Sequence, residues 1–82
     1  MMNDRDSITT ARFALCLRDG GYPASLEPRK LYDALPDPAA ERRGMIRVVD
    51  ESGEDYLFPR SGFLELPPEL SAAIGRALRR AS

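Results

Sequence analysis

Apolar and polar residues form short runs along most of the chain, a pattern typical of strands rather than long helices. Residues 12–18 (RFALCLR) place apolar side chains between two charges, and a turn is predicted where Asp19 precedes two glycines. Residues 13, 15 and 17 share one face of this segment and residues 14 and 16 share the other. Because both faces are apolar, we expect a central strand.

Prolines interrupt the chain after this strand. Pro23 and Pro28 have no backbone N–H, so residues 20–28 predict an irregular excursion rather than a regular ladder. Residues 29–35 (RKLYDAL) follow, and a proline on each side limits any helix there to about two turns. A strand is favoured for residues 29–35, with a short helix as the alternative.

The clearest unit is a β-hairpin. Residues 45–50 (MIRVVD) are rich in β-branched side chains, and residues 55–59 (DYLFP) return as a second strand. Between them, residues 51–54 supply a turn in which Gly53 is placed for a positive φ angle. If Ile46, Val48 and Leu57 face inward, Tyr56 and Phe58 become the most exposed pair of the hairpin.

Two shorter segments flank the hairpin. In residues 36–44, Asp37 can cap a single helical turn with Pro38 at its first position, and Gly44 can end it. Residues 61–66 carry three large apolar side chains and predict a last short strand or a single turn that covers the core.

The C-terminal segment has helical periodicity. Glu69 suits the positive end of the helix dipole, and three arginines lie near the other end. One face carries an apolar stripe that we expect to pack on the protein's own barrel, with docking on another chain as the alternative. The stripe consists of Leu70, Ile74, Ala77 and Leu78.

These elements predict one mainly β domain, because 82 residues leave room for no more. We expect residues 1–10 to be a flexible tail, residues 11–66 to form a small SH3-like barrel of four to five short strands, and residues 67–82 to form an amphipathic helix packed on that barrel. A chain of this size buries only roughly 60% of its unfolded surface, so a shallow binding face is easier to build than a deep pocket.

Three runs of sequence support this fold through a resemblance. RFALCLRDGG from Arg12, SLEPRKLY from Ser25 and MIRVVDESGEDYLFP from Met45 resemble a family of small uncharacterised bacterial proteins with an SH3-like barrel. The similarity covers roughly residues 13–63, and Phe58 stands where tyrosine is more usual in that family. The resemblance implies a fold and adds no chemistry.

Composition excludes several classes of function. Twelve basic and thirteen acidic residues give a net charge of −1, whereas strong nucleic-acid binders usually have a basic excess. The chain has no histidine, the commonest general base and metal ligand. Cys16 is the single cysteine, so we expect a packed thiol rather than a nucleophile. We predict no enzyme activity and no cofactor.

The N-terminus lacks the apolar core of a signal peptide, and no run approaches the length of a membrane helix. We therefore expect a cytoplasmic protein without a membrane partner, as a monomer or a weak homodimer.

The hairpin tip is acidic. Four carboxylates surround one tight turn, which suggests a divalent-cation site, a docking point for a basic partner, or a solvated tip that aids solubility. The alternating spacing of an EF-hand loop is missing, so the sequence argues against a metal. The four residues are Asp50, Glu51, Glu54 and Asp55.

Aromatic and arginine side chains are the remaining candidates for binding. In SH3-like barrels an aromatic groove binds proline-rich segments, whereas aromatics with arginines on a barrel can stack on single-stranded nucleic acid. Most of the rings could instead fill the core. We predict a small protein-binding module, with an RNA- or DNA-binding barrel as the alternative. The candidate residues are Tyr32, Arg47, Tyr56, Phe58, Arg60 and Phe63.

Overall fold

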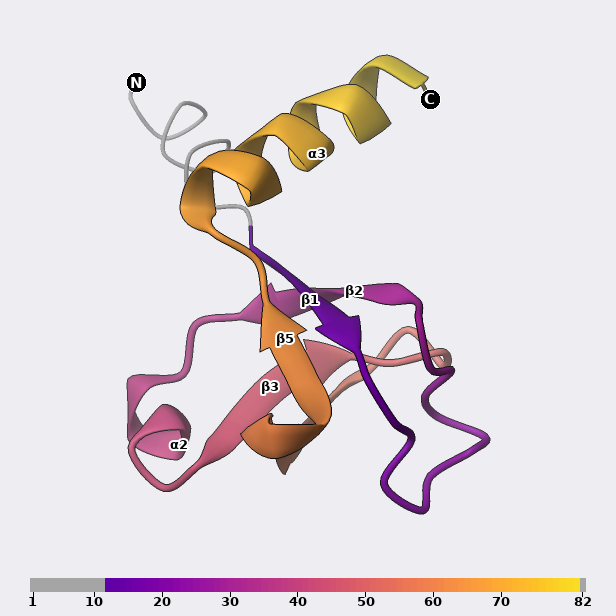
Figure 1. The fold of residues 1–82 in the computed structure, drawn as a ribbon, viewed down its shortest axis with the longest axis vertical. Helices are drawn as coiled ribbons and strands as arrows, with labels where there is room; N and C mark the ends of the chain where they lie inside the picture. Colours follow the sequence, from indigo (N-terminus) through magenta and orange to yellow (C-terminus); the bar gives the residue numbers. More distant parts are fainter. Residues whose placement is uncertain (1–11, 82) are drawn as a thin grey trace.

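The computed structural model of the protein describes residues 12–81. It contains five strands, a short helix α2, one 3-10 turn and a long C-terminal helix α3 (Figure 1). In chain order these are β1 (Phe13–Cys16), β2 (Leu31–Leu35), α2 (Pro38–Glu41), β3 (Met45–Val49), β4 (Asp55–Pro59), the 3-10 turn (Arg60–Gly62), β5 (Phe63–Glu65) and α3 (Pro68–Ala81). The predicted mainly β domain with a C-terminal helix is confirmed, and the expected flexible tail lies outside the described residues.

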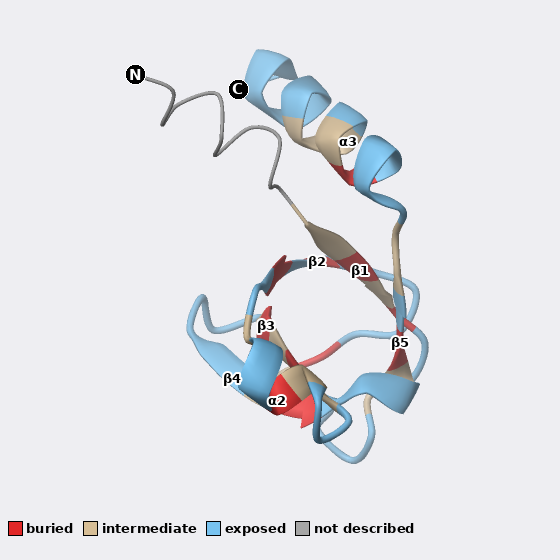
Figure 2. Cartoon of the chain, turned by 90° about the vertical axis from the view of Figure 1, so that its left-hand side faces the viewer, coloured by how far each residue is buried: buried red, intermediate tan, exposed pale blue. Residues whose placement is uncertain are grey.

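The strands form one antiparallel sheet in the order β4-β3-β2-β1-β5. The first strand, β1, pairs with β2 on one side and β5 on the other, which confirms its central place. Figure 2 shows the strands curling around a common interior. Within the described residues, β4 and β5 are the two edges of the sheet and do not pair, so the barrel is open.

The core lies on the concave side of the sheet. Alternation along β1 buries Ala14 and Cys16 completely, because successive strand residues point to opposite faces. The same alternation in β2 buries its second and fourth residues, which confirms a strand rather than a short helix for this segment. The buried cluster consists of Ala14, Cys16, Leu26, Tyr32, Ala34, Ile46, Val48, Phe58 and Phe63.

The hairpin forms with the predicted strands but presents different faces. Phe58 pairs with Ile46 and Tyr56 pairs with Val48, whereas Leu57 pairs with Arg47. Directly paired residues of an antiparallel ladder point to the same side. Phe58 therefore lies inward beside Ile46 and is only 4% exposed, so the expectation of an exposed Tyr56–Phe58 pair was wrong for Phe58.

Local signals in the connections behave as predicted. Asp37 caps α2 by accepting a hydrogen bond from the backbone N–H of Ala40, and Pro38 is the first helical residue. Gly53, in the hairpin turn, has a φ of 87°, a backbone conformation that residues with a side chain rarely adopt. For residues 61–66 we predicted either a short strand or a single turn, and both are present, since the end of the 3-10 turn is followed directly by β5.

Helix α3 is anchored to the barrel at its first turn. Ser71 is its only buried residue, and the Ser71 hydroxyl accepts a hydrogen bond of 3.1 Å from the backbone N–H of Phe13. Figures 1 and 2 show the rest of the helix extending away from the barrel. Leu70 and Leu78 are 47% and 56% exposed, so the predicted packing along the barrel does not extend to these leucines. No helix among residues 12–81 has the length and apolar character to cross a membrane.

Candidate functional site

The loop between β1 and β2 places an aromatic ring above the core. Gly20 and Gly21 both have positive φ angles, 62° and 92°, which glycine adopts without strain. The backbone N–H of Gly21 donates to the Asp19 carboxylate, and the N–H of Tyr22 donates to the Asp19 carbonyl, each at 2.9 Å. These bonds close the turn that delivers Tyr22 to the edge of β4.

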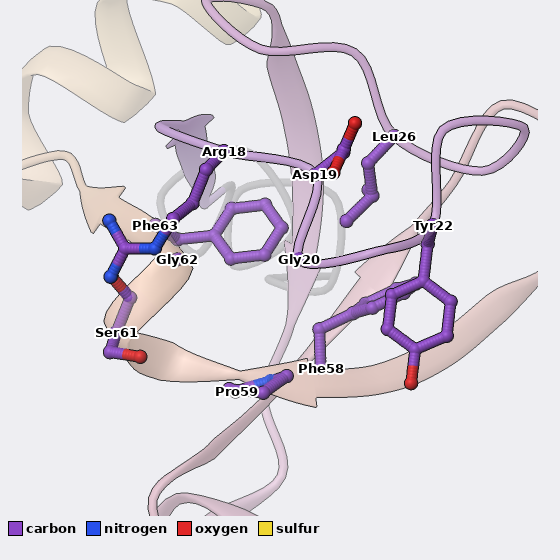
Figure 3. A pocket seen from close by; sticks show the side chains of 10 residues that line it. All are labelled: Arg18, Asp19, Gly20, Tyr22, Leu26, Phe58, Pro59, Ser61, Gly62 and Phe63. Atoms are coloured by element: carbon purple, nitrogen blue, oxygen red, sulfur yellow. The ribbon is translucent and has the colours of Figure 1, made fainter.

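Three aromatic rings form a continuous series at this point. The ring of Tyr22 meets Phe58 edge-on, with centroids 5.6 Å apart and planes at 76°. Phe58 in turn lies 6.2 Å from Phe63. Tyr22 is 51% exposed, whereas Phe58 and Phe63 are buried. Figure 3 shows the side chains of Tyr22 and Phe58 next to each other. The exposed ring of Tyr22 therefore packs on core residues, which restrict its motion.

A small pocket of about 80 Å³ opens beside these rings (Figure 3). Hydrogen bonds hold its walls: an Arg18 guanidinium N–H donates to the Ser61 carbonyl at 2.8 Å, and the N–H of Leu17 donates to the Gly62 carbonyl at 2.8 Å. The β1–β2 loop and the 3-10 turn are thereby fixed to each other across the pocket. Its lining is Arg18, Asp19, Gly20, Tyr22, Leu26, Phe58, Pro59, Ser61, Gly62 and Phe63.

A second hollow, of about 260 Å³, adjoins the first at Tyr22 and Phe58. Tyr56, Leu57 and Ser25 complete its lining. Tyr56 is 49% exposed, and its hydroxyl donates to the Glu54 carboxylate at 2.6 Å, which raises the pKa of Tyr56. We call the two hollows together the aromatic groove, meaning the surface lined by the residues of both.

The acidic tip does not gather its carboxylates at one point. Asp50 is only 6% exposed because it serves the turn itself, accepting hydrogen bonds from the N–H and hydroxyl of Ser52. The Ser52 hydroxyl bond is the main reason that the pKa of Asp50 is lowered. Glu54 is engaged by Tyr56, and Asp55 faces the outer side of the hairpin. Among the described residues, no group of three metal-binding side chains is close enough to hold an ion.

Glu51 joins the tip to the interior through Tyr32. The Tyr32 hydroxyl donates to the Glu51 carboxylate and accepts a 2.7 Å hydrogen bond from the backbone N–H of Glu27. Lys30 lies 2.7 Å from the same carboxylate. Hydrogen bonds from Lys30 and then Tyr32 lower the pKa of Glu51, whereas burial and the bond to Glu51 raise the pKa of Tyr32 to about 12. Tyr32 is therefore a buried structural residue that links Glu51 to the backbone of Glu27, and it does not line the groove.

The two candidate arginines are occupied by carboxylates. Arg47 lies on the outer face of the hairpin, 2.9 Å from Asp37 and 2.9 Å from Asp55. Arg60 lies 2.8 Å from Glu65. Neither guanidinium lines the groove, so the structure does not bring Arg47 and Arg60 together with the exposed aromatics for the predicted nucleic-acid face.

Cys16 is fully buried in the interior. Its thiol donates to the Arg18 carbonyl at 3.3 Å, and burial raises the pKa of this thiol. A thiol that stays protonated is a poor nucleophile, which agrees with the expectation of a packed residue.

Three predicted residues, Tyr56, Phe58 and Phe63, contribute to the groove, although the last two form its floor. Sequence reasoning missed Tyr22 and Arg18 as groove residues. The available signal was an aromatic residue in a Gly- and Pro-rich loop, since such loops often carry binding residues. Comparisons with known protein families, with curated proteins and with solved structures find no match for this chain.

Proposed function

We propose that this protein is a small SH3-like binding module that holds an extended segment of a partner protein in the aromatic groove. The observation that carries this proposal is the half-exposed ring of Tyr22, which stands on Phe58 between two adjoining hollows. An aromatic side chain fixed in this way offers a large contact area with little entropy left to lose on binding.

The size of the hollows favours side chains of a peptide over a small-molecule ligand. Pockets for drug-sized ligands usually enclose about 300–1,000 Å³. The hollows have volumes of about 80 and 260 Å³, and they are separated by the Tyr22–Phe58 contact. Two small hollows in a line suit successive apolar side chains of an extended chain.

The topology supports a proline-rich partner. We take the open sheet, with its order β4-β3-β2-β1-β5 and a 3-10 turn between β4 and β5, as an SH3-like barrel. In such barrels, aromatic grooves between loops bind polyproline segments, whose conformation is already extended before binding. The groove here lies between the β1–β2 loop on one side and β4 with that 3-10 turn on the other.

A peptide selection tests the proposal. The immobilised protein is used to select binders from a random dodecapeptide library, and each binder is measured against wild type, Tyr22→Ala and Leu35→Ala. Leu35 is a matched control because it is an exposed apolar residue of β2 that does not line the groove. We expect proline-containing binders that lose roughly tenfold or more in affinity with Tyr22→Ala and keep it with Leu35→Ala. Failure to enrich any binder sensitive to Tyr22→Ala would overturn the proposal.

A further inference from the structure

Strand β4 points backbone groups toward the open edge of the sheet. At one end of the ladder between β3 and β4, the Arg60 N–H donates to the Gly44 carbonyl at 2.9 Å. Because bonding alternates along an antiparallel strand, residues 56 and 58 bond to β3, whereas Asp55 and Leu57 point their N–H and C=O groups away from it. Within the part of the chain that the structure describes, β4 is an edge of the sheet, so these two residues have no neighbouring strand on that side.

The second hollow of the aromatic groove lies along this edge. Its lining combines the rings of Tyr56 and Phe58, which face inward, with Leu57, whose side chain faces outward. The part of Leu57 that meets this hollow is therefore its backbone. On the other side of the hollow, the backbone groups of Tyr22 bond within the β1–β2 loop. The hollow thus combines apolar rings with an N–H and a C=O that are available for a strand.

Pro59 limits how much of this edge can pair. Proline has no N–H, so the available stretch ends before this residue. Edge strands of natural proteins use proline in this way against unspecific pairing. Leu57 and Asp55 therefore remain as pairing positions, two residues apart. A short segment fits this edge better than a full-length strand.

We infer that the partner segment pairs with Leu57 as a short added strand and that it has the pattern proline, non-proline, proline, basic residue. This inference rests on the proposed function and specifies the partner of the same groove. In antiparallel pairing, the single non-proline residue exchanges both backbone hydrogen bonds with Leu57. Its N–H is required, and a proline could not supply it.

The two residues that flank the non-proline residue face the aromatic rings. Side chains alternate along a strand, so both flanking side chains point to the inward side, where Tyr56 and Phe58 lie. The backbone nitrogen of each points away from β4, so neither position needs an N–H. Proline suits both positions, because its φ is compatible with the edge of a sheet and it keeps the preceding residue extended.

The charge around Asp55 favours a basic residue at the fourth position. In the antiparallel register that residue lies opposite Asp55 and on the outer face of the sheet. Arg47 is shared between Asp55 and Asp37, at 2.9 Å from each, so it neutralises Asp55 only in part. The Asp55 side chain is 45% exposed, and the adjacent Glu54 adds a second exposed carboxylate. A lysine or arginine of the partner complements this charge.

Backbone esters in a synthetic peptide test the strand pairing. The probe is the nonapeptide GAAPLPRAG, whose leucine is expected opposite Leu57. Replacing the N–H of that leucine by an ester oxygen removes one hydrogen bond and should weaken binding roughly three- to tenfold. The matched control carries the ester at the first alanine, whose N–H faces away from β4, and should bind like the parent peptide. Chemical-shift titrations of the nitrogen-15-labelled protein give the three affinities.

Amide hydrogen exchange reads out the same contact on the protein. The Leu57 N–H lacks a strand partner in the free protein, whereas the N–H of Phe58 already bonds to β3. Saturation with the peptide should slow exchange at Leu57 roughly tenfold more than at Phe58. Replacing the peptide arginine by glutamine should weaken binding about two- to fivefold, and Asp55→Asn should remove most of this difference.

The outcomes separate this inference from the proposed function. Tyr22-dependent binding without protection of the Leu57 amide, or with no effect of the leucine ester, would overturn the strand pairing and leave the groove as the binding site. Equal binding of the arginine and glutamine peptides would overturn the basic position. If the nonapeptide does not bind although the library yields Tyr22-dependent binders, the pattern is wrong and the proposed function stands. Absence of both would overturn the two together.

Discussion

The ring of Tyr22 stands edge-on against Phe58, at 5.6 Å between centroids, although the first residue is half exposed and the second is buried. One contact thus links a loop residue of the candidate groove to the hydrophobic core. This arrangement gives the two residues different roles, which substitution can separate.

Replacing Phe58 should mainly reduce stability. Phe58→Ala empties a buried site, and we expect the free energy of unfolding to fall by about 3–5 kcal/mol. Tyr22→Ala removes an exposed ring and should cost only about 1 kcal/mol, the size of one aromatic pair. Urea denaturation measures both values. If Phe58→Ala is unfolded in buffer, Phe58→Leu provides a milder comparison, and equal losses for Tyr22→Ala and Phe58→Leu would contradict the assignment.

Tyr32 should make the fold sensitive to alkaline pH. The folded protein holds the Tyr32 proton up to a pKa of about 12, chiefly because the ring is buried, and the unfolded chain releases it near pH 10. A pKa that is raised on folding contributes stability below pH 10, and this contribution is lost as pH rises from about 10 to 12. Urea midpoints measured across this range should fall for wild type.

Tyr32→Phe removes the titrating group and serves as the control for that pH dependence. The variant should lose about 1–2 kcal/mol at neutral pH, because the Glu27 N–H and the Glu51 carboxylate lose a hydrogen-bond partner. It should also decline less steeply above pH 10. An alkaline slope identical to that of wild type would show that Tyr32 is not the group responsible.

Asp37 should contribute to stability at neutral pH and lose this contribution in acid. Its carboxylate accepts from the Ala40 N–H and pairs with Arg47, and these contacts, the backbone bond first, lower the pKa of Asp37. A lowered carboxyl pKa means that the stabilisation is present above the ordinary range near pH 4 and is lost as pH falls below it. Asp37→Ala should lower the melting temperature by a few degrees at pH 7 and little at low pH.

Asp37→Ser separates the helix cap from the ion pair, since serine can cap a helix but carries no charge. The melting temperature of Asp37→Ser should lie closer to that of wild type than to that of Asp37→Ala, because a partly exposed ion pair contributes little to stability. Equal losses in the two variants would instead assign the effect to the pairing with Arg47.

The strands and turns were predictable because local signals determine them. Proline and glycine positions mark the breaks around β2 and the hairpin, and Asp37 followed by Pro38 marks the start of α2. The faces of the hairpin were not predictable in the same way. Residues 56, 57 and 58 are all large and apolar, so alternation alone does not say which side meets the core.

The groove was only partly predictable because its walls are distant in sequence. Tyr22 meets Phe58 across 36 positions through a loop conformation that depends on tertiary hydrogen bonds. Arg47 looked free in the sequence, but one of its two carboxylate partners is the N-cap residue before α2 and the other lies in β4. Contacts of this kind depend on the folded arrangement rather than on local pattern.

The most direct test of the binding proposal is a chemical-shift map of the nitrogen-15-labelled protein titrated with a proline-rich decapeptide. The account predicts saturable shifts in residues 18–22 and 56–62, with residues of β2 and α3 unaffected at a fixed protein concentration. The same titration of Tyr22→Ala should show much weaker shifts. Shifts centred outside the groove, or none as the peptide approaches millimolar concentration, would contradict the claim that this groove binds an extended partner segment.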